Sequence, residues 1–60
     1  MSKSKEILTG WIEAIQEQGR GLSKWEEDFV DSVSEQLSSR GTLSERQEET
    51  LERIYAEKTP

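Results

Sequence analysis

"GLSKWEEDFVDSV", residues 21–33, contains a complete helix start followed by an apolar face at helical spacing. Ser23 and Glu26 stand three residues apart, as in a capping box, where each side chain accepts a hydrogen bond from the other residue's backbone amide. At roughly 100° per residue, the apolar side chains behind this start fall within about 140° of one another. They are Trp25, Phe29, Val30, Val33 and Leu37. The stretch predicts an amphipathic helix over residues 24–39 that ends before Gly41.

A second copy of this pattern, "TLSERQEETLERI", occupies residues 42–54. Ser44 is its N-cap and Gln47 is its capping-box partner. The apolar face behind them spans only about 100° and consists of Leu51, Ile54 and Tyr55. This copy predicts a helix over residues 45–57. We attribute the repetition to the start that two amphipathic helices share, rather than to a duplication.

The segment before these two copies, "SKEILTGWIEAIQEQ", predicts a third amphipathic helix over residues 4–18. Its apolar side chains also fall within about 140°, and they are Ile7, Leu8, Trp11, Ile12 and Ile15. Gly10 weakens the middle of this helix by about 1 kcal/mol relative to alanine. The helix is expected to end at Gly19 or Gly21, since glycine readily takes the left-handed conformation that closes a helix.

The two connections between these helices are short and contain glycine, at residues 19–22 and 41–43. Short connections place consecutive helices antiparallel. The sequence therefore predicts an all-α fold, an up-down-up three-helix bundle that forms a single domain over residues 1–60. Because helices 4–18 and 24–39 have the wider apolar faces, we expect them to form the main contact, with helix 45–57 laid across their groove.

The composition argues against an enzyme. The chain contains no cysteine and no histidine, so the commonest nucleophiles, general bases and metal ligands are missing. The acidic run of residues 26–31 comprises Glu26, Glu27, Asp28 and Asp31. Acids early in a helix are favoured by the helix dipole, and this run lacks the glycine turn of a calcium loop. We predict no catalytic site, no metal site and no cofactor.

The chain is also predicted to be soluble and cytoplasmic. No apolar run approaches the roughly 20 residues that a membrane span needs, and "MSKSKE" lacks the apolar core of a signal peptide. Thirteen acids against eight bases give a net charge of −5, which disfavours direct contact with nucleic acid. An alternative is weak nucleic-acid contact through Arg46, Arg53 and Lys58, and a further alternative is an acidic mimic of DNA.

The aromatic residues point to a protein partner. Trp11 lies near the middle of its apolar arc and is predicted to be core. Trp25 lies at the edge of its arc beside Ser32 and Gln36, so both core packing at a bundle end, which we slightly prefer, and a half-exposed anchor stay open. Tyr55 lies at the corresponding edge of its own helix. The predicted partner-binding residues are Trp25, Phe29, Ser32 and Tyr55.

The leading functional prediction is a small acidic helical module that binds another protein, with self-association as an alternative. The two copies of the helix start differ at Trp25 and Phe29, which align with Arg46 and Thr50. The shared positions are caps and core contacts, so a function specific to this chain is expected where the copies differ.

Residues 22–55 resemble a short helical module of phage and prophage proteins of DNA replication and recombination. The positions that carry the resemblance are Leu22, Ser23, Trp25, Glu26, Phe29, Ser32, Val33, Leu43, Ser44, Gln47, Leu51, Ile54 and Tyr55. The resemblance implies an accessory module that works through protein contacts or near single-stranded DNA. It supplies no catalytic or binding residue.

Overall fold

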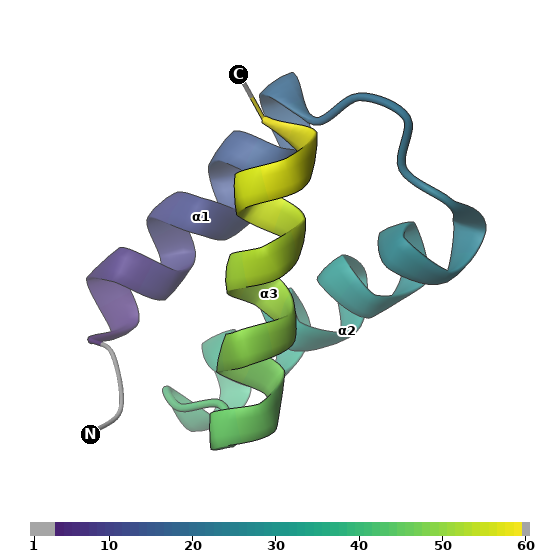
Figure 1. Cartoon of the computed structure of the whole chain (residues 1–60). Coiled ribbons are helices and arrows are strands. Elements are labelled where there is room, and N and C mark those ends of the chain that lie inside the picture. The colour runs from purple at the N-terminus through teal and green to yellow at the C-terminus, as the bar shows by residue number, and fades with distance from the viewer. Residues whose placement is uncertain (1–3, 60) are drawn as a thin grey trace.

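The computed structural model describes residues 4–59, and within them the chain folds into three α-helices without a strand (Figure 1). Helix α1 spans Lys5–Gln18, α2 spans Lys24–Arg40 and α3 spans Glu45–Lys58. The all-α prediction is confirmed. The predicted helix boundaries differ from the observed ones by one residue at most.

All three helices begin at a serine cap, and two of these caps, Ser23 and Ser44, were predicted. Ser4 Oγ accepts a hydrogen bond from the Ile7 amide at 3.3 Å, so α1 begins before Gly10 despite that glycine. At the start of α2, the Ser23 amide donates to Glu26 Oε1 at 2.8 Å and the Glu26 amide donates to Ser23 Oγ at 3.1 Å. Ser44 and Gln47 make the same two bonds at 2.9 Å and 3.1 Å at the start of α3. Both capping boxes are complete.

Two glycines take the left-handed conformation, Gly21 with φ of 72° and Gly41 with φ of 80°. Gly41 closes α2 directly, whereas Gly21 turns the chain two residues beyond the cap of α1. That cap, Gly19, is extended, and a side chain there would place Cβ 2.4 Å from the Ile15 carbonyl oxygen. A close approach of the backbone, rather than a positive φ, therefore explains glycine at position 19.

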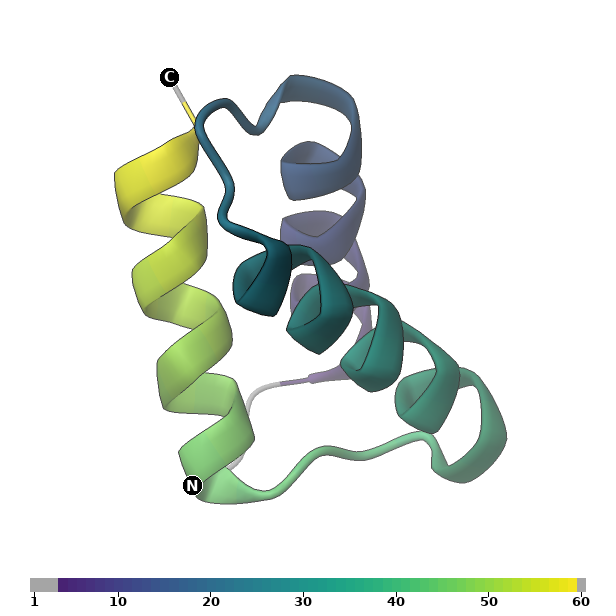
Figure 2. The ribbon, with the colours of Figure 1, turned by 90° about the vertical axis from the view of Figure 1, so that its right-hand side faces the viewer.

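The three helices run up, down and up. The Arg20 amide donates to the Lys58 carbonyl at 3.0 Å, which places the C-terminal ends of α1 and α3 side by side. Gln36, late in α2, bonds to Gln47, early in α3, so α2 runs in the opposite sense. Figure 2 shows that α2 crosses obliquely between the two connections. The short glycine-containing connections therefore produce the predicted topology.

One hydrophobic core lies between the helices. Its buried members are Leu8, Ile12, Ile15, Val30, Val33, Leu37, Leu43, Leu51 and Ile54. Trp11, Leu22, Phe29 and Tyr55 are partly buried and pack against it. Trp11, predicted to be core, thus packs against the core but is only partly buried. Ile7 was expected on the buried face of α1 but is 48% exposed, because it lies at the edge of that face, whereas its neighbour Leu8 lies nearer the middle and is buried.

The main helix contact is not the predicted one. Helix α1 packs more extensively against α3 than against α2. The buried face of α3 is wider than its apolar residues suggest, because Glu48 is only 4% exposed. On the same edge of α3, Tyr55 stacks on Trp11 of α1 with ring centroids 5.5 Å apart. The methylene groups of a glutamate and one face of a tyrosine thus add to the packing surface.

Candidate functional site

Trp25 is 62% exposed, so the preferred interpretation of this residue as core is wrong. It lies in the first turn of α2, where its ring stacks on that of Phe29 one turn later, with centroids 5.4 Å apart and planes 14° from parallel. Phe29 in turn packs against the core. Because Phe29 fills the position between Trp25 and the core, the indole is left with one face on a ring and the rest in solvent.

A shallow, open groove of about 400 Å³ lies between these two rings and the start of α3. Its lining residues are Trp25, Phe29, Ser44, Arg46, Gln47 and Thr50. Thirteen of the sixty residues in the chain are acidic, yet none of them lines this groove. Arg46 is its one charged residue. An exposed tryptophan therefore stands in a local environment unlike the rest of this highly charged surface.

Two pairs of residues that differ between the two helix starts come together in this groove. Trp25 and Phe29 supply the wall from α2, and Arg46 and Thr50 supply part of the wall from α3. We call these four residues the Trp25 surface. The alignment of the two copies identified these positions as differences between the copies, but it gave no reason to expect contact between them.

The other two predicted partner-binding residues lie elsewhere. Ser32 is exposed on α2 and lines a separate shallow depression with Glu35 and Gln36. Tyr55 is half-buried against Trp11 on the side where α3 packs on α1. Of the predicted set, the structure brings together Trp25 and Phe29 only.

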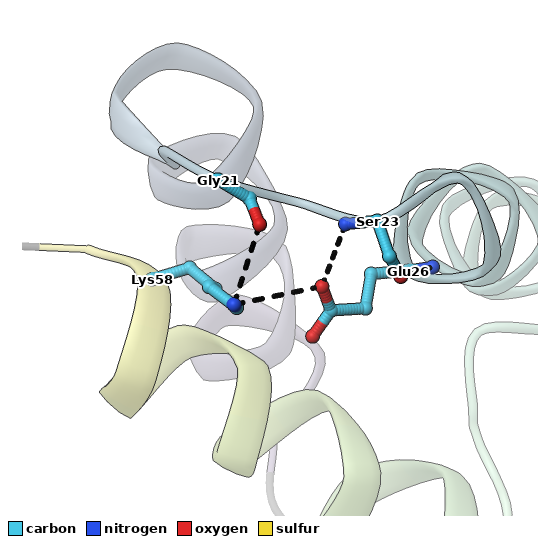
Figure 3. A network of polar contacts seen from close by, with 4 residues as sticks. All are labelled: Gly21, Ser23, Glu26 and Lys58. Atoms are coloured by element: carbon cyan, nitrogen blue, oxygen red, sulfur yellow. Dashed lines mark hydrogen bonds and ion pairs between the residues drawn. The ribbon is translucent and has the colours of Figure 1, made fainter.

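Lys58, one of the three residues of the nucleic-acid alternative, is engaged within the fold (Figure 3). Its Nζ lies 3.8 Å from Glu26 Oε1 and donates to the Gly21 carbonyl oxygen at 3.3 Å. Arg46 and Arg53 share an exposed depression with Glu45 and Glu49, and Lys58 does not line it. The three cations therefore do not form a continuous basic patch.

Each capping box also links α2 to α3. Glu26 caps its own helix and pairs with Lys58 at the end of α3. Gln47 caps its own helix and exchanges two side-chain hydrogen bonds with Gln36, both 3.0 Å long. Since the two helices are antiparallel, these links hold both ends of the pair. The repeated sequence pattern thus has a tertiary role in addition to starting two helices.

The network around Glu26 makes the stability of the fold depend on pH. The hydrogen bond from the Ser23 amide, reinforced by the charge of Lys58 and partly offset by burial, holds the pKa of the Glu26 carboxyl below its ordinary value. A group whose pKa is lowered by folding stabilises the native state above its unfolded pKa, and this contribution is lost as pH falls through the folded pKa.

A Glu26→Gln variant tests this dependence. Glutamine keeps the capping acceptor, as Gln47 does for Ser44, but loses the charge opposite Lys58. We expect the variant to melt below the wild type at neutral pH, and the gap to close in acid as the wild-type carboxyl is protonated. Thermal melts across this pH range measure the gap. Glu27→Gln, an exposed acid in the same helical turn, is the control for the helix dipole. A difference in melting temperature between the wild type and Glu26→Gln that does not change with pH would contradict the lowered pKa of Glu26.

Two acids of the acidic run lie beside lysine side chains. Glu26 faces Lys58, and exposed Asp28 lies 3.8 Å from exposed Lys24 in a surface pair of little energetic weight. Residues 4–59 hold no cluster of three or more carboxylates placed to bind a metal ion. Over the same residues, no helix has the length and apolar character that crossing a bilayer requires.

The chain matches no protein-family model, no curated protein and no solved structure. The resemblance of residues 22–55 to phage replication modules stays a prediction that these comparisons do not test. The chemistry of the groove beside Trp25 is therefore the basis for any functional proposal.

Proposed function

We propose that this chain is a protein-binding module whose contact residue is Trp25, and that it has no catalytic activity of its own. The observation that carries the proposal is the exposure of this indole beside a groove that no acidic residue lines. An aromatic side chain presents roughly 150–250 Å². Covering the exposed 62% of the indole at about 25 cal/mol per Å² gives about 3 kcal/mol toward binding.

The composition of the Trp25 surface supports the same proposal. The centres of protein–protein interfaces are enriched in aromatic residues and arginine and depleted of acidic residues. The residues whose truncation weakens binding most are commonly tryptophan, tyrosine and arginine. Trp25, Phe29 and Arg46 fit this description, whereas the surface of the chain as a whole does not.

The nucleic-acid alternative has less support. Backbone phosphates are bound by clustered cations, and Lys58 is held by Glu26 while Arg46 and Arg53 stand among acids. The resemblance to phage modules implied a role either through protein contacts or near single-stranded DNA, and only the role through protein contacts agrees with this proposal. A role near single-stranded DNA would require the chain to bind that DNA with micromolar affinity, and this affinity would fall steeply with added salt.

Capture of partners by the immobilised chain tests the proposal, with Trp25→Ala compared against Ile7→Ala. These two residues are the large exposed apolar side chains of the described region, so each variant removes one of them. We expect specific proteins from the native cell extract to bind the wild type and Ile7→Ala but not Trp25→Ala. The expected loss of affinity is at least about 2 kcal/mol, or roughly thirtyfold.

The comparison requires that Trp25→Ala remains folded. Since the ring is largely exposed, its stack on Phe29 is worth only a few tenths of a kcal/mol, and alanine has the higher helix propensity. We expect its free energy of unfolding to stay within about 1 kcal/mol of the wild type. Equal capture by a folded Trp25→Ala protein would show that the proposal is wrong.

A further inference from the structure

We infer that the segment bound at the Trp25 surface presents an apolar side chain next to a carboxylate. This inference rests on the proposed function and specifies the chemistry of the partner. It follows from asking which groups in the groove are still able to make new contacts.

Each uncharged polar side chain of the groove already makes at least one hydrogen bond within the fold. The Ser44 hydroxyl accepts from the Gln47 amide, and the Gln47 side chain bonds to Ser44 and to Gln36. The Thr50 hydroxyl donates to the Arg46 carbonyl oxygen at 3.0 Å. The groove therefore offers a ligand two main features, the aromatic rings of α2 and the guanidinium of Arg46. The rings favour an apolar side chain.

The charge in the groove selects an acid. No ion pair involving Arg46 forms within residues 4–59. A guanidinium matches a carboxylate through two parallel hydrogen bonds, and Arg46 stands in the first turn of α3, where the helix dipole also favours negative charge. A lysine or arginine on the ligand would meet repulsion at the same point. The charge that lines this groove is thus opposite in sign to the net charge of the chain, and the acids beside Arg46, Glu45 and Glu49, line the neighbouring depression instead.

A second copy of the chain is a less suitable occupant. A stable dimer buries about 800 Å² on each partner, which is close to a fifth of the 4375 Å² that this chain exposes. A groove lined by six residues offers far less than that area. Two copies with a net charge of −5 each also repel one another. A short segment of a different protein fits the size of the groove better.

The probe for this inference is a random-peptide display library selected on the intact chain. We expect peptides that lose binding to Trp25→Ala to be enriched in an aromatic or large aliphatic residue with aspartate or glutamate within a few positions. One such peptide is then titrated against Arg46→Gln, Arg46→Glu and Arg20→Glu. Arg20→Glu changes the net charge as Arg46→Glu does, but it lies beside Lys58, about 18 Å along α3 from Arg46.

Affinity should fall by about tenfold with Arg46→Gln and further with Arg46→Glu, whereas Arg20→Glu should change it less than about threefold. Trp25-dependent peptides that are basic or uncharged, or that bind Arg46→Glu as well as wild type, would overturn the inference and leave the proposed function intact. If no selected peptide depends on Trp25, both are wrong. If the free chain sediments as a dimer that buries Trp25, the inference is also wrong, because a second copy of the chain then occupies the groove.

Discussion

Leu51→Ala should remove about half of the free energy of unfolding of the chain. Leu51 is fully buried in α3, with 0% of its surface exposed, among core residues from the other two helices. Replacing such a leucine by alanine costs about 2–5 kcal/mol, through lost burial and through the cavity left behind. At about 0.05–0.15 kcal/mol per residue, sixty residues provide roughly 3–9 kcal/mol in all. One substitution therefore removes much of the available stability.

Helix content by circular dichroism against denaturant concentration measures this loss. We expect the midpoint of the cooperative transition to fall to about half of the wild-type denaturant concentration. Leu22→Ala is the matched control, because Leu22 is only partly buried where it packs against the same core. Leu22→Ala should lower the free energy of unfolding by less than half as much as Leu51→Ala does. A Leu51→Ala midpoint equal to that of Leu22→Ala would mean that α3 is not packed as described.

Gln47→Ala should lower the free energy of unfolding by about 2 kcal/mol. The substitution removes the carboxamide that accepts from the Ser44 amide and exchanges two bonds with Gln36. Hydrogen bonds of this kind contribute about 0.5–1.5 kcal/mol each. The link matters because α2 and α3 make the smallest of the three helix contacts. Its loss also leaves the half-buried Gln36 amide without this partner.

Gln47→Glu separates the two roles of this side chain. Glu26 shows that a carboxylate can complete the capping box in this fold. Glutamate at position 47 would keep the cap and accept from Gln36, but it could not donate in return. Chemical denaturation should therefore place Gln47→Glu between the wild type and Gln47→Ala. If both variants are as stable as the wild type, the link between α2 and α3 contributes nothing to folding.

The helix boundaries could be predicted because caps are local. Ser23 and Glu26, or Ser44 and Gln47, specify a helix start within four residues, and the structure forms both as expected. The topology also followed, since each connection has only a few residues. These properties depend on neighbours in the sequence and need no knowledge of the rest of the fold.

The packing and the groove could not be predicted because they depend on residues far apart in the sequence. Because Glu48 is polar, helical periodicity does not place it on the buried face of α3. It is buried because α1 packs along α3. Lys58 was interpreted as a free cation because its contact with Glu26 spans thirty-two positions. Arg46 lines the groove only because α3 passes beside the first turns of α2. In each case, the helix to which the residue belongs was predicted correctly, but its neighbours were not.

The exposure of Trp25 also has a physical reason that the sequence left open. A residue at the edge of an apolar arc lies on the boundary between core and solvent, and Phe29 decides the outcome by occupying the inner position. Trp25 is therefore exposed and accessible to a partner, as the interface interpretation requires, whereas Tyr55 packs against Trp11. Whether a partner uses that anchor is the question that the proposed capture and peptide selection address.

Fluorescence quenching of Trp25 by a neutral quencher tests the central claim most directly. A Trp11→Phe variant leaves Trp25 as the sole tryptophan and keeps an aromatic ring against Tyr55. The account predicts that the free protein is quenched nearly as efficiently as an unfolded control of the same variant, and that a bound Trp25-dependent peptide protects the indole. Strong shielding of Trp25 in the free, monomeric protein would contradict the account, since it would place the ring in the core.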